Sequence, residues 1–125
     1  MVALERVCRV ATVSRTGVPQ VVPVVHVLVG DKLYFASEGE AKKVKNLRAD
    51  PRIAVTIDVY SEDWKSLKGV AIQGTAAVLG NGPRFRKIRD LLYEKFPQYE
   101  PDAEIVPGRT LAIEIDPTWV SRGGV

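Results

Sequence analysis

The sequence predicts a mainly β protein, an antiparallel barrel of six strands, closed or nearly closed, with one short and one longer α-helix. Short runs rich in β-branched residues alternate with tight turns, which is typical of strands joined as hairpins. Only two segments place apolar residues at helical spacing. A parallel sheet needs a helical crossover between most of its strands, so the antiparallel arrangement fits better, and closure removes exposed strand edges.

The first third of the chain predicts a meander of three strands. Residues 7–14 and residues 20–29 (QVVPVVHVLV) are apolar runs joined by a turn at residues 15–17. The pair Gly30-Asp31 then forms a tight turn into a third strand at residues 32–36.

The middle of the chain predicts a short helix followed by two strands. Ala41, Val44 and Leu47 have helical spacing, and Pro51 ends this helix because a residue before proline avoids helical geometry. Residues 52–59 and 70–79 again have strand character, and the polar and aromatic link YSEDWKSLKG joins them.

The longer helix begins near Pro83, which suits a first helical turn. One face of this helix gathers four apolar residues: Phe85, Ile88, Leu92 and Phe96. A last alternating strand follows at residues 110–115 and ends at Asp116-Pro117.

Length and composition favour one domain over residues 1–125, because a second core would have too little sequence. No stretch approaches the roughly 20 apolar residues of a membrane span, and the N-terminal segment lacks the features of a secretory signal. We therefore expect no membrane partner and a cytoplasmic location. Cys8 is the only cysteine, so we expect it to be a buried strand residue without a disulfide.

The residue inventory excludes several kinds of active site. One histidine and one cysteine cannot build a histidine-cluster metal site, a zinc finger or a Cys-His nucleophilic pair within one chain. Neither a phosphate loop nor a dinucleotide-binding glycine motif occurs. We predict no metal site and identify no catalytic side chain, so difficult chemistry would come from a cofactor.

The most informative local feature is the basic segment around the start of the short helix. Lys42, Lys43, Lys45 and Arg48 lie within about two helical turns, directly after a strand. A helix N-terminus offers unpaired N–H groups to an anion, so a phosphate would bind well at this point. The alternative is an ordinary solvated basic face. An oligonucleotide-binding barrel is a remote alternative, because few aromatic residues accompany these cations, and we expect no nucleic-acid partner.

The order of segments resembles a known family. The run ATVSRTGVPQVVPVVHVLVGDKLYFAS, followed by AKKVKNLRADPRIAVTIDVYSEDWKSLKGVAIQGTAAVL, is similar to the split-barrel flavin-binding proteins typified by pyridoxamine 5′-phosphate oxidase. The resemblance covers roughly residues 4–80. It implies a six-stranded antiparallel split β-barrel of the Greek-key type that binds FMN at the interface of a homodimer.

The resemblance also implies cofactor-binding residues. The FMN phosphate would be bound by Ser37, Lys42 and Lys43. The edge of the isoalloxazine ring would lie along Pro23, Val24, Val25 and His26, with backbone groups contacting its polar atoms. Trp64 and Gln73 would reach the ring from the partner chain.

The sequence departs from the oxidase itself, since it is shorter and lacks the arginine-rich C-terminal segment that binds pyridoxal phosphate. It looks closer to short FMN- or deazaflavin-dependent reductases. The leading hypothesis is an FMN-dependent oxidoreductase that acts on a small organic substrate. The alternatives are a reductase that uses 8-hydroxy-5-deazaflavin, and a non-catalytic protein that binds flavin or haem, for which His26 is the sole histidine available as an axial ligand.

Overall fold

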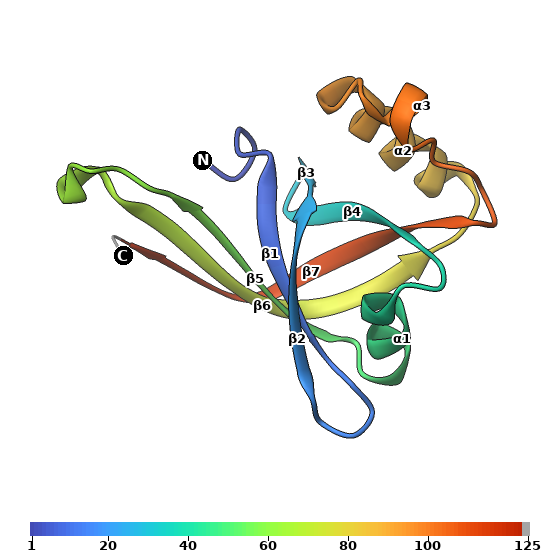
Figure 1. Ribbon diagram of the computed structural model, residues 1–125, viewed down its shortest axis with the longest axis horizontal. Coiled ribbons are helices and arrows are strands. Elements are labelled where there is room, and N and C mark those ends of the chain that lie inside the picture. The colour runs from blue at the N-terminus through green and yellow to red at the C-terminus, as the bar shows by residue number, and fades with distance from the viewer. Residues whose placement is uncertain (124–125) are drawn as a thin grey trace.

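Seven antiparallel strands form one strongly curved sheet in the computed structural model, which describes residues 1–123 (Figure 1). The strands are β1 (Val7–Val13), β2 (Pro19–Val25), β3 (Val27–Val29), β4 (Lys32–Glu38), β5 (Arg52–Val59), β6 (Lys68–Leu79) and β7 (Thr110–Gly123). Their order in the sheet is β2-β1-β5-β6-β7-β4-β3. The predicted mainly β, antiparallel class is confirmed.

The predicted number of strands is wrong, because the run QVVPVVHVLV forms two strands rather than one. His26 interrupts it, and its backbone N–H donates to the carbonyl of Arg6, 3.3 Å away. Before this residue β2 pairs with β1, and after it β3 pairs with β4. Since β2 and β3 are the first and last strands of the sheet order, His26 joins the two edges of the curved sheet covalently.

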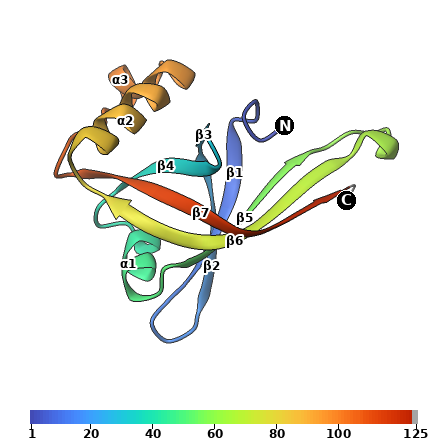
Figure 2. The ribbon, with the colours of Figure 1, turned by 180° about the vertical axis from the view of Figure 1, so that it is seen from behind.

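The helices are α1 (Lys42–Ala49), α2 (Pro83–Lys95) and the short α3 (Tyr99–Asp102), with a 3₁₀ helix at Trp64–Ser66. The first two confirm the predicted short and longer helices, whereas α3 was not predicted. Both views show α2 and α3 on one side of the molecule and the projecting β5–β6 hairpin on the other (Figures 1 and 2). No helix within residues 1–123 is long and apolar enough to span a membrane.

Two apolar clusters hold these elements together. The larger one fills the concave inner face of the sheet, where Val44 and Leu47 of α1 pack against strand residues such as Phe35 and Ile57. The second lies between α2 and the opposite face of β4 and β7, and it includes Tyr34 and Phe85. Alternate residues of β4 therefore serve different clusters, as the two-residue period of a strand requires.

The ladder between β6 and β7 contains a β-bulge. Its register shifts at Gln73 and Gly74, which face Trp119 and Pro117, so Thr118 is the extra residue. The Thr118 hydroxyl donates to the Gln73 carbonyl at 3.2 Å. A Cβ at Gly74 would overlap the carbonyl oxygen of Asp116 and lie 3.0 Å from its carbonyl carbon, so the bulge requires glycine.

The helices α2 and α3 lie in an excursion between β6 and β7. The two strands pair up to the position where Leu79 faces Ala112. The chain leaves the ladder at Gly80 and returns beside it, where the Gly108 N–H donates to the Gly80 carbonyl at 3.4 Å.

Candidate functional site

Five strands present a continuous outer face, defined by the side chains of β2, β1, β5, β6 and β7 that point away from the inner cluster. The pairing registers arrange this face in rows across the sheet. One row consists of Val21, Ala11, Ala54, Gln73 and Trp119. The next consists of Pro23, Arg9, Thr56, Ala71 and Ser121.

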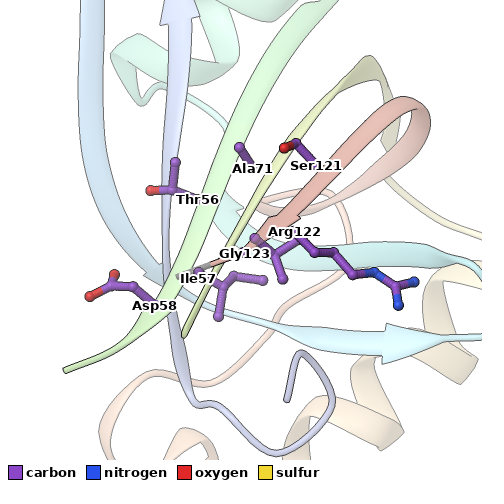
Figure 3. A pocket seen from close by; sticks show the side chains of 9 residues that line it. Thr56, Ile57, Asp58, Ala71, Ser121, Arg122 and Gly123 are labelled. Atoms are coloured by element: carbon purple, nitrogen blue, oxygen red, sulfur yellow. The ribbon is translucent and has the colours of Figure 1, made fainter. Parts of the chain in front are cut away.

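Two adjoining hollows on this outer face make up what we call the outer trough. The larger has a volume of about 650 Å³ and is lined by residues of β1, β2, β5, β6 and β7, among them Pro19, Arg52 and Gln73. The smaller, of about 410 Å³, is shown in Figure 3 with Thr56, Ala71 and Ser121 from three neighbouring strands. Volumes of this size are ordinary for small-molecule sites.

The centre of the trough carries small side chains. Ala11, Ala54 and Ala71 lie on adjacent strands, and their small size leaves the sheet backbone accessible. Large apolar side chains stand beside them: Val21 is 66% exposed and Trp119 is 50% exposed. A flat apolar group or a second protein surface can therefore lie directly against the sheet.

The charges in the trough are largely paired. Arg9 forms an ion pair with Asp58 at 3.1 Å, and Arg52 forms one with Asp50 at 2.7 Å. Hydrogen bonds from the side chain and backbone of Arg52 lower the pKa of Asp50 to about 2. The Asp50 carboxylate therefore stays ionised near neutral pH and is unsuited to accepting a proton there.

The helix α1 packs on the inner side of the sheet, and its C-cap residue Asp50 meets the trough at Arg52. Asn46 of this helix donates a buried hydrogen bond at 3.0 Å to the hydroxyl of Thr12, which belongs to the lining of the larger hollow. Lys42 and Lys43 lie about one turn earlier in α1. Neither lysine forms an ion pair with any residue that the structure describes, and the N-cap residue Ala41 provides no side-chain cap. The first turn of α1 therefore presents two lysines without an ion-pair partner among the described residues, whereas Lys45 pairs with Glu40 at 3.9 Å.

Ser37, the third predicted phosphate ligand, is the penultimate residue of β4 and lies before the turn that leads into α1. Its side chain is buried, and its hydroxyl donates to the Glu38 carbonyl at 3.1 Å. Ser37 therefore closely precedes α1 along the chain, but its hydroxyl already donates a hydrogen bond to the backbone.

The predicted ring-edge segment divides between the two faces of the sheet. Pro23 is exposed on the outer face, Val24 packs against the inner cluster, and Val25 packs against the cluster under α2. Because β2 pairs only with β1, half of its backbone N–H and C=O groups point away from the ladder. This free edge suits the backbone contacts that the resemblance implies.

His26 lies away from the trough. Its side chain is 1% exposed, and its Nε2 atom is 2.9 Å from the carbonyl oxygen of Val2. Burial lowers its pKa, and the nearby ammonium of Lys95 adds to this effect. In this conformation His26 offers no accessible nitrogen to a haem iron.

Gln73 and Trp64 are far apart along the β5–β6 hairpin. Gln73 lies in the outer trough, on the same face as Pro23. Trp64 is at the tip of the hairpin, where its side chain is 73% exposed. Within one chain the structure therefore brings Pro23 and Gln73 to one face and leaves Trp64 at the tip of the β5–β6 hairpin. This hairpin projects from the molecule in Figure 1.

Sequence reasoning missed Arg52, Gly74 and Thr118 as parts of the trough. Gly74 did carry a usable signal, because an isolated glycine in a strand often marks a bulge or a close backbone approach. The contribution of Thr118 follows from the register of β7 against β6, and no local pattern reveals that register.

Comparison with known proteins places this geometry in context. A family model described as pyridoxamine 5′-phosphate oxidase matches residues 1–122. No curated protein gave a match.

Solved structures share the fold. A FAD-binding protein from Mesorhizobium loti is 25% identical, with a TM-score of 0.80 over 97% of this chain and 85% of that one. The haem storage protein HutZ from Vibrio cholerae is 13% identical, with a TM-score of 0.82 over 97% and 87%. An F420 reductase is 20% identical, with a TM-score of 0.70 over 96% and 94%.

Proposed function

The chain belongs to the pyridoxamine 5′-phosphate oxidase family, and on that premise we propose that it binds a flavin-type cofactor, with FMN the first candidate, and acts as an oxidoreductase on a small organic substrate. The observation that carries the proposal is the outer trough with its centre of small side chains. A tricyclic aromatic ring needs such a flat surface, and the exposed Trp119 beside it adds apolar contact.

The residues present fit a planar ring that carries a phosphate. Gln73 offers an amide donor and acceptor to polar atoms of a ring, and the free edge of β2 offers backbone groups. The uncompensated Lys42 and Lys43 at the uncapped start of α1 suit the phosphate. A bound flavin supplies the redox chemistry, so the chain itself needs only to bind, orient and exclude water.

A homodimer is part of the proposal. The trough is open to solvent, and exposed apolar residues such as Val21 and Trp119 share its face. A second copy packed on this face would cover those residues and close the trough. In such a dimer Trp64, on the projecting hairpin, would contact the site of the other chain. Light scattering should give twice the monomer mass, and a monomer in the presence of FMN would contradict this part.

The first test is the absorption spectrum of the purified protein after incubation with FMN and removal of free ligand by gel filtration. A retained flavin spectrum near one ring per chain supports the proposal. If FMN is not retained, the same experiment with the 8-hydroxy-5-deazaflavin coenzyme tests the second cofactor that the same residues suit, since both carry a tricyclic ring and a phosphate. Retention of neither refutes the proposal.

A double variant tests the phosphate site. Lys42→Ala with Lys43→Ala removes two charge-assisted contacts worth about 1.5 to 3 kcal/mol each, so FMN affinity should fall by about 100-fold or more. The matched control is Arg86→Ala with Lys87→Ala, which removes the same charge from the exposed face of α2. Equal FMN affinities of the two double variants would show that the phosphate binds elsewhere.

A non-catalytic flavin carrier is the second candidate, favoured by the side chains of the trough. Among the described residues that line its two hollows, the one carboxylate is Asp58, which is paired with Arg9. Reduction of the bound flavin by a nicotinamide donor, followed by transfer to a dye or quinone, distinguishes an enzyme from a carrier. Failure of every donor to reduce the flavin would favour the carrier.

A further inference from the structure

Another hollow lies on the inner side of the sheet, opposite the outer trough. This inner chamber has a volume of about 410 Å³, and its walls are largely aliphatic side chains of strand and link residues, among them Leu28, Ile72 and Val120. Residues 1–3 line it as well. Met1 and Val2 pack against the inner apolar cluster, so the N-terminal segment covers apolar surface.

Hydrogen bonds hold residues 1–6 against the bend between β2 and β3. His26 binds it twice: Nε2 lies 2.9 Å from the Val2 carbonyl oxygen, and the backbone N–H donates to the Arg6 carbonyl. The Lys95 ammonium donates to the carbonyls of Glu5 at 2.7 Å and His26 at 2.9 Å. The Arg6 guanidinium in turn donates to the Lys95 carbonyl at 3.2 Å. Residues 1–6, the β2–β3 corner and the end of α2 thus meet at His26.

The surroundings of His26 favour its neutral form. A carbonyl oxygen only accepts, so Nε2 carries the hydrogen, and Nδ1 holds a lone pair. Nδ1 is buried without a hydrogen-bond partner among residues 1–123. The charged or titratable groups around the ring are Lys95 of α2, Glu5 and Arg6 of the N-terminal segment, and Cys8 of β1. Burial raises the pKa of the Cys8 thiol to about 11, so it contributes no negative charge near neutral pH.

We propose that residues 1–6 form a lid over the inner chamber, held shut by neutral His26 and opened when His26 is protonated. A second proton would leave the Nδ1–H without an acceptor and would place a buried cation beside Lys95, whereas the Val2 carbonyl and Glu5 compensate only in part. Opening of the lid exposes the ring to water and removes this cost. The proposal is independent of which cofactor the outer trough binds.

The difference in the pKa of His26 between the closed and open forms determines how strongly lid opening depends on pH. A histidine whose pKa is lowered in the closed form favours that form above the free-imidazole value of about 6.5, and this preference is lost as pH falls. Between the pKa of His26 in the closed form and that of a free imidazole, the equilibrium constant for opening rises by up to tenfold for each pH unit of acidification.

The sole histidine makes a direct measurement possible, because the imidazole gives one set of NMR signals in the untagged protein. We expect its pKa to lie below about 6.5. The His26 amide, which donates to Arg6, should lose hydrogen-exchange protection by up to tenfold per pH unit in the same range, while the amide of buried Val55 keeps its protection. Fluorescence of an apolar dye should rise in parallel as the chamber opens.

His26→Gln retains a neutral amide and removes the titration, so its lid protection should not change between about pH 7 and pH 5. An unchanged pH dependence in this variant would overturn the proposal. If the variant does not fold, the wild-type data still decide: an imidazole pKa at or above 6.5, or constant lid protection while the imidazole titrates, refutes the lid.

Discussion

Gly74→Ala should destabilise the protein strongly. The added Cβ would overlap the Asp116 carbonyl oxygen and lie 3.0 Å from the carbonyl carbon and 3.2 Å from the Pro117 Cα. All three atoms belong to the backbone of β7, so no side-chain rotation relieves the contact. An ordinary contact begins near 3.4 Å, so the carbonyl carbon alone requires β6 and β7 to separate by 0.4 Å, and the overlap with the carbonyl oxygen requires more. Overpacking of this kind costs about 1 to 3 kcal/mol, and a weakened ladder hydrogen bond adds about 1 kcal/mol.

Denaturant unfolding at fixed protein concentration measures the loss of free energy. Gly123→Ala is the matched control, because a Cβ at that end of β7 meets no atom within 4 Å. In a Trp64→Phe background, Trp119 fluorescence reports separately on the trough, since Trp119 directly follows the extra residue of the bulge. A Gly74→Ala protein as stable as the control would refute the assigned register of β6 against β7.

Three further outcomes follow from buried groups. Thr12→Val leaves the Asn46 amide without its acceptor, so the free energy of unfolding should fall by about 1 to 3 kcal/mol, and an unchanged denaturation midpoint would contradict this. Burial opposes ionisation of Glu114, but the Tyr34 hydroxyl, Arg84 and Lys32 outweigh it and lower its pKa. The stability that this carboxylate contributes is therefore present above about pH 4.3 and lost as pH falls through the folded pKa, so Glu114→Gln should show a smaller stability difference between neutral and acid pH than wild type. Cys8 is fully buried with its pKa raised to about 11, so alkylation should occur at the rate of unfolding, and rapid labelling of the native protein would show that β1 is open.

The sequence predicted the strand class and both longer helices because their signals are local. Val44 and Leu47 are buried as their spacing predicts, and so are Phe85, Ile88 and Leu92. The resemblance to the flavin-binding family is confirmed by the family match over residues 1–122. The end of the last strand was misjudged, because β7 continues past Pro117 as far as Gly123. The bulge explains this, since it accommodates Pro117 and Thr118 without ending the ladder.

The predicted site was less accessible to sequence reasoning. QVVPVVHVLV is apolar at nearly every position, so it shows no alternation from which to assign its faces. Only the register of β2 against β1 places Pro23 outside and Val24 inside. The break at His26 depends on the N-terminal segment and on Lys95, which is 69 residues away in sequence. Long-range contacts of this kind leave no local pattern.

The excursion between Gly80 and Arg109, which contains α2 and α3, can be redesigned separately from the β6–β7 ladder. Both ends of the excursion meet beside the β6–β7 ladder, so a segment of another length could replace it without altering the register of β6 against β7. Each doubling of a flexible loop costs only about 0.6 kcal/mol. The constraint lies instead in what the excursion covers and contacts, because a replacement must still shield Tyr34 and Ala112 and supply the hydrogen bonds of Lys95 to Glu5 and His26. Grafting and insertion experiments can therefore target α2 and α3 while leaving the outer trough intact.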